Sequence, residues 1–154
     1  MTKLQQGDSA PNFELSDQNG ATIALSDFAG QNLLIYFYPK ADTPGCTRQA
    51  CSVRDSRPDL DKLDIAAVGM SPDAPDKQKK FDTKYELGFP LLSDADHAVA
   101  AAYGAWGEKT SYGKKTEGII RSSFLVDGSG KIIGAWYKVK PEDTVPKAQE
   151  ALKK

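Results

Sequence analysis

The chain has 154 residues, of which 40% are hydrophobic and 27% are charged, as expected for one globular domain. Its 20 Lys and Arg nearly balance its 21 Asp and Glu, and the net charge of −1 gives no electrostatic reason to expect nucleic acid or an anionic membrane as a partner. No apolar run approaches the ~20 residues of a membrane span, and residues 1–13 contain no stretch that could act as a signal peptide, so we expect a single domain over 1–154 in the cytoplasm.

The predicted elements alternate between strands and helices along the chain. A continuous apolar run at 33–38, ended by Pro39, is typical of a strand covered on both faces. A short hairpin precedes it, and the last two strands form a second hairpin around a Gly-rich turn. In chain order we expect strands 13–15, 22–25 and 33–38, helix 43–57, strand 65–70, helices 74–86 and 94–103, strands 123–126 and 131–136, and helix 143–153.

This order of elements predicts an α/β fold with a central mixed sheet flanked by helices. A central strand that leads directly into a cysteine-bearing helix is the arrangement of thioredoxin-like folds, to which the N-terminal hairpin would be an extension. The cysteine spacing is C-x-x-x-x-C, however, and not the C-x-x-C of thioredoxin. Residues 104–118 form a long, Gly-rich and aromatic segment, which we expect to serve as a mobile lid or a partner surface.

The first cysteine follows a helix-start signal. Thr43 is a good N-cap and Pro44 suits the first helical position, which places Cys46 third in the helix. Free backbone N–H groups and the helix dipole favour a negative group there, and therefore the reactive thiolate. The alternative is that Cys46 is an inert buried thiol, since free cysteine is among the most buried residue types.

The second cysteine, Cys51, lies five positions after Cys46 in the same predicted helix. In a regular helix this spacing gives a rise of ~7.5 Å and a Cα separation of roughly 8.6 Å. A disulfide needs about 4.4–6.8 Å, so the two cysteines can bond only if the helix unwinds locally. The spacing leaves open whether Cys51 takes part in redox chemistry or faces the core and never reacts.

Pro39, Thr43 and Cys46 form the pattern P-x-x-x-T-x-x-C, which resembles the signature of the peroxiredoxins. The likeness is closest to the Q-type group, also called bacterioferritin-comigratory proteins, and it extends over nearly the whole chain. The blocks that carry it are 7–15, 25–30, 36–40, 42–47, 54–55, 89–94, 103–109 and 121–127.

The resemblance implies a thiol peroxidase that reduces hydrogen peroxide and organic hydroperoxides. Cys46 would be the peroxidatic cysteine, whose thiolate becomes a sulfenic acid, and Cys51 the resolving cysteine that forms a disulfide with it. The Thr43 hydroxyl would hold the peroxide, Pro39 would shield the thiolate, and Arg121 would stabilise it. Thioredoxin or a similar dithiol would reduce the disulfide, and the protein would be a monomer without metal or organic cofactor.

The chain departs from the Q-type pattern at two places. Gln49 stands where many relatives carry Glu, so any role for a carboxylate there is absent. Other members keep a second cysteine in the following helix, whereas residues 77–85 contain none, which leaves Cys51 as the only intramolecular partner. The remaining charged candidates are expected to be solvated helix positions, namely His97, Arg48, Arg54 and the Lys-rich segment 77–80.

Two other functions stay open at this point. A general thiol–disulfide oxidoreductase would act on protein disulfides, although the C-x-x-x-x-C spacing argues against it, and an insulin-reduction assay would detect it. A redox sensor or holdase would bind partners on oxidation, and it would react with peroxide no faster than an uncatalysed thiol.

Overall fold

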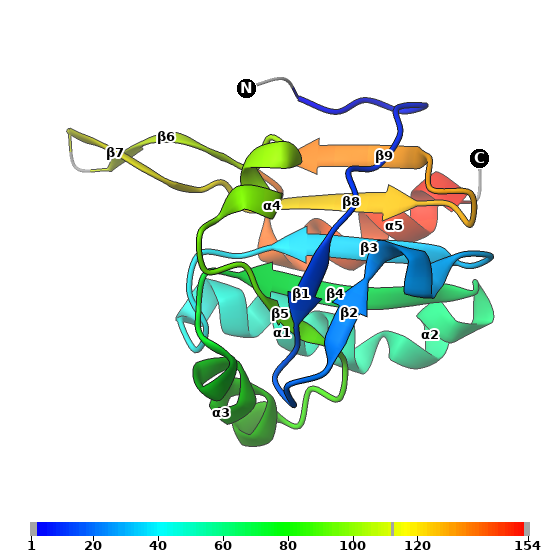
Figure 1. The fold of residues 1–154 in the computed structure, drawn as a ribbon, viewed down its shortest axis with the longest axis horizontal. Helices are drawn as coiled ribbons and strands as arrows, with labels where there is room; N and C mark the ends of the chain where they lie inside the picture. Colours follow the sequence, from blue (N-terminus) through cyan, green and yellow to red (C-terminus); the bar gives the residue numbers. More distant parts are fainter. Residues whose placement is uncertain (1–2, 112, 153–154) are drawn as a thin grey trace.

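The computed structural model describes residues 3–111 and 113–152, and Figure 1 shows how their elements are arranged. The strands are β1 (Glu14–Ser16), β2 (Thr22–Ala24), β3 (Asn32–Phe37), β4 (Ile65–Ser71), β5 (Leu91–Ser93), β6 (Trp106–Ser111), β7 (Lys114–Ile119), β8 (Ser122–Val126) and β9 (Ile132–Tyr137). The helices are α1 (Pro44–Asp55), α2 (Arg57–Lys62), α3 (Pro75–Tyr85), α4 (Ala98–Ala102) and α5 (Thr144–Leu152), with short 3₁₀ turns η1 (Leu25–Phe28) and η2 (Pro141–Asp143).

The central sheet has the strand order β5-β4-β3-β8-β9. Strands β3, β4 and β5 run parallel, whereas β8 runs antiparallel to both of its neighbours, β3 and β9. The hairpin of β1 and β2 crosses one face of this sheet (Figure 1). The expected α/β fold is therefore confirmed, with its mixed sheet, its flanking helices and its N-terminal hairpin. No helix in the two described ranges is long and apolar enough to cross a membrane.

Strand β3 lies at the centre of the sheet because both of its faces are apolar. Successive side chains of a strand point to opposite faces. The even-numbered side chains of 34–38 belong to one buried cluster, and the odd-numbered side chains of 33–37 belong to the other. The continuous apolar run in the sequence is thus explained by burial on both sides.

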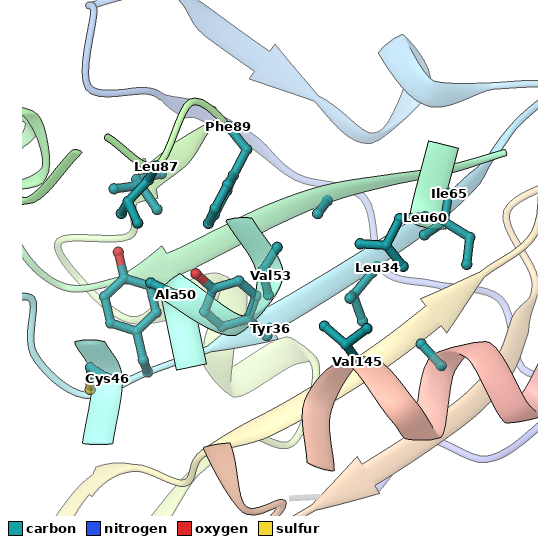
Figure 2. Packing of buried hydrophobic residues seen from close by; sticks show 14 of the residues in the cluster. Leu34, Tyr36, Cys46, Ala50, Val53, Leu60, Ile65, Leu87, Phe89 and Val145 are labelled. Carbon is teal, nitrogen blue, oxygen red and sulfur yellow. The ribbon is translucent and has the colours of Figure 1, made fainter. Parts of the chain in front are cut away.

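Helices α1, α2, α3 and α5 contribute to the first cluster, which also contains Cys46. Figure 2 shows Cys46, Ala50 and Val53 of α1 with Tyr36 of β3 and Val145 of α5. The cysteine-bearing helix is therefore anchored on the sheet by one apolar stripe. The opposite face is covered by the N-terminal segment, the β1–β2 hairpin and α4.

The segment 104–118, which we expected to serve as a mobile lid or a partner surface, consists largely of two strands that the sequence did not predict. It contains β6 and β7, which pair antiparallel with Trp106 opposite Ile119 and project from the body of the molecule (Figure 1). Residues 113–117 are exposed. This exposed stretch has no alternation of apolar and polar residues, and such alternation is the signal by which strands are predicted.

Two helix boundaries also differ from the expected ones. Helix 43–57 stops at Asp55, and a separate helix, α2, follows it with Pro58 in its first turn. His97 was expected to be a solvated helix residue, which was wrong. It precedes α4 in the left-handed conformation, with φ 49°, and its ring stacks on Trp106 at a centroid distance of 3.6 Å.

Candidate active site

The loop between β3 and α1 carries the chain to the start of the cysteine-bearing helix. The backbone N–H of Tyr38 donates to the Met70 carbonyl, which keeps the end of β3 paired. Thr43 is the N-cap residue with an extended backbone, and Pro44 is the first helical residue, as expected. The Thr43 hydroxyl makes no cap bond to α1; it donates instead to the carbonyl of Lys40 at 2.8 Å.

Cys46 is the third residue of α1, and only 1% of it is exposed. Arg121 lies 75 positions later, directly before β8, and its Nη2 donates to the Cys46 sulfur at 3.4 Å. Glycine at position 45 makes room for this guanidinium, because a Cβ there would lie 3.1 Å from Nη2. The sulfur therefore meets a fixed positive charge in addition to the free N–H groups of the helix start.

Arg121 is itself held by Gln49, which is fully buried on the same face of α1 as Cys46. The Nη1 of Arg121 donates to Oε1 of Gln49 at 2.7 Å, and Nε2 of Gln49 donates to the Thr144 hydroxyl at 2.8 Å. Because an amide is neutral, Gln49 orients the guanidinium without compensating its charge. That charge stays available to stabilise negative charge on sulfur or on a substrate oxygen.

Cys51 is partly buried and lies in the same unbroken helix, and both cysteines are free thiols. Five residues of regular helix separate their Cα atoms by roughly 8.6 Å, which is beyond the range of a disulfide. The structure thus represents a dithiol state in which Cys51 is held away from Cys46.

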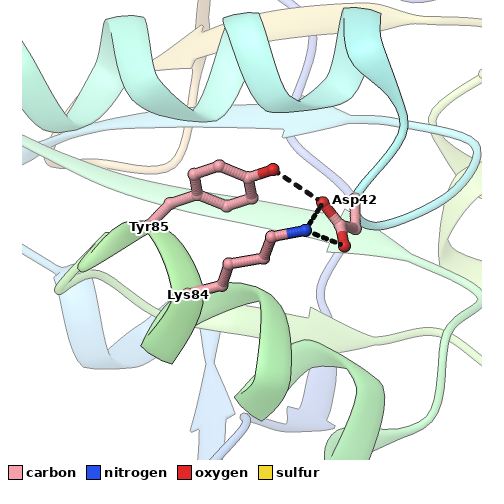
Figure 3. Close-up of polar contacts among 3 residues, drawn as sticks. All are labelled: Asp42, Lys84 and Tyr85. Atoms are coloured by element: carbon pink, nitrogen blue, oxygen red, sulfur yellow. Dashed lines mark hydrogen bonds and ion pairs between the residues drawn. The ribbon is translucent and has the colours of Figure 1, made fainter.

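Four residues fasten both ends of α1 to the end of α3, and we call them the Tyr85 clip: Asp42, Arg54, Lys84 and Tyr85. Asp42 accepts hydrogen bonds from Nζ of Lys84 at 2.9 Å and from the Tyr85 hydroxyl at 2.8 Å (Figure 3). These bonds, that of Lys84 first, lower the pKa of Asp42 below its usual value. At the other end of α1, Arg54 donates to the Tyr85 carbonyl at 2.6 Å.

Two tyrosines, Tyr36 of β3 and Tyr38 directly after it, lie in the same cluster as Cys46. The Tyr38 hydroxyl donates to Oε1 of Gln78 at 2.6 Å, whereas the buried Tyr36 hydroxyl has no hydrogen-bond partner in the described part of the chain. Gly69 accommodates the Tyr36 ring, since a Cβ there would come within 2.9 Å of that hydroxyl. Burial raises the pKa of both tyrosines, so both stay neutral near pH 7.

The structure brings together only some of the five site residues that were predicted from the sequence. Cys46 and Arg121 are in direct contact. Pro39 and Thr43 lie in the loop before α1, where both are partly buried. Cys51 lies further along the same helix as Cys46, and regular helical geometry keeps the two cysteines apart.

Thr144 is a further site residue that the sequence patterns did not single out, and Gln49 was noted only as a departure from the Q-type pattern. Gln49 lies three positions after Cys46, and this spacing places two side chains on one helix face, so a signal was present. Thr144 had none, because its contact depends on how α5 packs. Arg54 was expected to be only solvated, which was wrong, whereas Arg48 is exposed as expected. Within the described residues, no group of three His, Cys, Asp or Glu side chains could hold a metal ion.

Comparison with known proteins identifies close relatives of this chain. The model of the AhpC/TSA family matches residues 6–135. Peroxiredoxin Bcp of Escherichia coli is 52% identical over 132 residues, which cover 86% of this chain and 85% of the relative. Peroxiredoxin Bcp of Bacillus subtilis is 44% identical over 150 residues, which cover 97% of this chain and 96% of the relative.

Solved structures give the same assignment. A mutant of peroxiredoxin Q from Xanthomonas campestris has a TM-score of 0.86 at 38% identity, with 92% of this chain and 90% of that chain covered. A PrxQ mutant from Xylella fastidiosa has a TM-score of 0.88 at 30% identity, with 99% and 96% covered. The thioredoxin-like fold and the resemblance seen in the sequence are both confirmed. The chain therefore belongs to the AhpC/TSA family and, within it, to the peroxiredoxins of the Bcp or Q type.

Proposed function

We propose that this peroxiredoxin reduces hydrogen peroxide and organic hydroperoxides with the thiolate of Cys46. The observation that carries the proposal is the Arg121 guanidinium, which donates to a buried cysteine sulfur at a helix start. A related bacterioferritin comigratory protein from Xanthomonas campestris, 38% identical, is described as having alkyl peroxide reduction activity. Its chemistry supports organic hydroperoxides as substrates here.

In the first step the Cys46 sulfur attacks one peroxide oxygen, an S–O bond forms and the O–O bond breaks. The sulfur is oxidised to sulfenic acid, and the departing oxygen leaves as hydroxide or alkoxide and takes up a proton to become water or an alcohol. Arg121 and the free N–H groups at the start of α1 donate to the oxygens that gain negative charge. In this proposal the Thr43 hydroxyl turns from Lys40 to hold the peroxide, and Pro39 excludes water from the sulfur.

In the second step the Cys51 thiol attacks the sulfenic sulfur, a disulfide forms and water leaves. This step requires α1 to unwind between the two cysteines, because the intact helix keeps them too far apart. An external dithiol, which we propose to be thioredoxin, then reduces the disulfide and restores the helix. The proposal also includes a monomeric single domain over 1–154 in the cytoplasm, and sedimentation analysis checks the monomer.

A coupled assay with thioredoxin and its reductase tests the proposal. The unmodified protein should turn over hydrogen peroxide and a small alkyl hydroperoxide, and Cys46→Ser should abolish this turnover. Retained turnover in Cys46→Ser would exclude Cys46 as the reacting group. A protein that reduces insulin but not peroxide would instead be a general thiol–disulfide oxidoreductase.

A matched variant, Cys51→Ser, tests the second step. It should keep one rapid oxidation of Cys46 but lose recycling by thioredoxin and become over-oxidised more readily. Mass spectrometry of the peroxide-treated native protein should show the loss of two hydrogens across the two cysteines. Normal recycling in Cys51→Ser would mean that the enzyme works with one cysteine.

A further inference from the structure

A series of hydrogen bonds, buried at its centre, connects the Cys46 sulfur to the C-terminal helix α5. It runs from Arg121 to Gln49, from Gln49 to Thr144, and from the Thr144 hydroxyl to the carbonyl of Lys140 at 3.4 Å. Gln49 and Thr144 are both fully buried. Neither touches the sulfur in the hydrogen bonds described, so each could act on the reaction only through Arg121.

The direction of every bond in this chain is determined by its neighbours. A guanidinium can only donate, so it must face the oxygen of the Gln49 amide. The NH₂ group of Gln49 then faces Thr144, whose oxygen must accept. The proton of the Thr144 hydroxyl is consequently directed to the carbonyl of Lys140. If the amide rotated by half a turn, its NH₂ group would oppose Arg121, donor against donor.

We propose that Thr144 is a positioning residue for the peroxidase reaction, because its hydroxyl fixes the Gln49 amide so that the amide oxygen holds Arg121 against Cys46. The inference rests on the proposed function. It makes the start of α5 part of the active site's support, although α5 supplies no reacting group. Pro141, in the turn η2 directly before α5, also lies close to this site. A Cβ added at Gly45 would be 3.8 Å from Cγ of Pro141, and the same Cβ would contact Arg121.

The pairing also explains why an amide suits position 49 in this chain. A Glu side chain there could accept from Arg121, but its second oxygen would face an acceptor, the Thr144 oxygen, unless the hydroxyl gave up Lys140. A carboxylate would also compensate the charge of Arg121. Thr144 and Gln49 are therefore matched to each other, and they leave the guanidinium charge directed at the sulfur.

The test compares Thr144→Val and Thr144→Ser, both in a Cys51→Ser background so that Cys46 is the only thiol. Valine keeps nearly the same volume but removes the acceptor, whereas serine keeps it. Single-turnover oxidation by hydrogen peroxide should slow by about tenfold in Thr144→Val, as expected when one hydrogen bond to a charged group is weakened. Thr144→Ser should recover to within about twofold of the parent.

A second readout separates positioning from loosened structure. Iodoacetamide needs the Cys46 thiolate but no donor aimed at a peroxide oxygen, and the sulfur is accessible to it only when the buried site opens. Alkylation of Thr144→Val should therefore be no faster than that of the parent. Val145→Ala is the matched control: it loses buried packing next to Thr144 but no hydrogen bond, so its melting temperature should fall while its oxidation rate is kept.

The outcomes are distinguishable. Parent-like oxidation of Thr144→Val, or slow oxidation together with faster alkylation, would overturn the positioning role while leaving the proposed function intact. A parent protein that itself reacts no faster than a free thiol would overturn the proposed function. Should Thr144→Val not fold, Thr144→Ala provides the same comparison.

Discussion

At the scale of single residues, Tyr36 and Tyr38 show how one chemical group can have opposite effects in one cluster. Both rings are fully buried, Tyr36 in β3 and Tyr38 directly after it, and their centroids are 5.5 Å apart. The Tyr38 hydroxyl donates a hydrogen bond to Oε1 of Gln78, and Nε2 of Gln78 donates to the Ser71 hydroxyl. The Tyr36 hydroxyl is buried and has no hydrogen-bond partner among the described residues. An unpaired buried hydroxyl opposes folding, whereas a paired one supports it.

The same substitution at these two positions should therefore change stability in opposite directions. Tyr36→Phe should leave the free energy of unfolding unchanged or raise it by up to ~1 kcal/mol, because it removes an unsatisfied group. Tyr38→Phe should lower it by about 1–3 kcal/mol, because Oε1 of Gln78 loses its donor. Urea denaturation with equal slopes for all three proteins measures both values. Equal losses in the two variants would contradict this account.

At the scale of elements, the Tyr85 clip sets what must move when α1 unwinds. Tyr85 binds Asp42 before the first residue of the helix and Arg54 near its last, and both cysteines lie between these contacts. Its ring is also held, edge to face, by Phe81 at a centroid distance of 5.6 Å. If Cys46 and Cys51 react as we propose, the clip favours the helical state, in which Cys46 meets peroxide, over the unwound state, in which Cys51 can reach it.

Tyr85→Phe should shift this balance, since it removes the bond to Asp42 and keeps the ring and the backbone carbonyl. Disulfide formation after oxidation should accelerate by about two- to fivefold, as expected for a bond that is largely exposed. The first oxidation of Cys46 should change by less than about twofold, because Arg121 is untouched. Rapid-quench mass spectrometry separates the two steps. Tyr137→Phe is the control: it loses two hydroxyl hydrogen bonds, to the Tyr103 carbonyl and from the Leu4 N–H, but lies away from α1. Slower disulfide formation in Tyr85→Phe would contradict the clip.

The pH dependence of the clip follows from the lowered pKa of Asp42, caused first by Lys84 and then by Tyr85. A pKa that is lowered in the folded state stabilises the fold at pH values above the ordinary aspartate range, and this contribution is lost as the pH falls through the lowered value. Asp42→Asn suits the test, since asparagine tolerates the left-handed conformation found here, φ 61°. Its melting temperature should lie below that of the parent by a constant amount from about pH 5 to 8, and the gap should close below about pH 4. A gap that widens in acid would contradict this account.

At the scale of the whole molecule, the signals that could be interpreted from sequence were local ones. The apolar run of β3 predicted the central strand, and Thr43 with Pro44 predicted the start of α1 within one residue. The contact between Cys46 and Arg121 spans 75 positions, and residue type alone gives no sign of it; only the resemblance to a family did. The link to Thr144 could not be predicted at all, because it depends on the packing of α5 and on a neutral amide whose orientation is determined by its partners.

Gly45 is where α1 meets two segments that are distant in the sequence, since Arg121 and Pro141 of η2 both approach the missing side chain of this helix residue. Alanine has the higher helix propensity, so Gly45→Ala should raise the free energy of unfolding by up to ~1 kcal/mol. Its Cβ would lie 3.1 Å from Nη2 of Arg121, which must then move by a few tenths of an ångström from the sulfur and Gln49. We therefore expect a more stable protein that oxidises about tenfold more slowly, as for a disturbed charge-assisted hydrogen bond.

Thermal denaturation and single-turnover oxidation measure the two effects, with Arg48→Ala on the exposed side of α1 as the control. Full activity with raised stability would show that the reaction tolerates this displacement of Arg121, and that the glycine serves the flexibility of α1 instead.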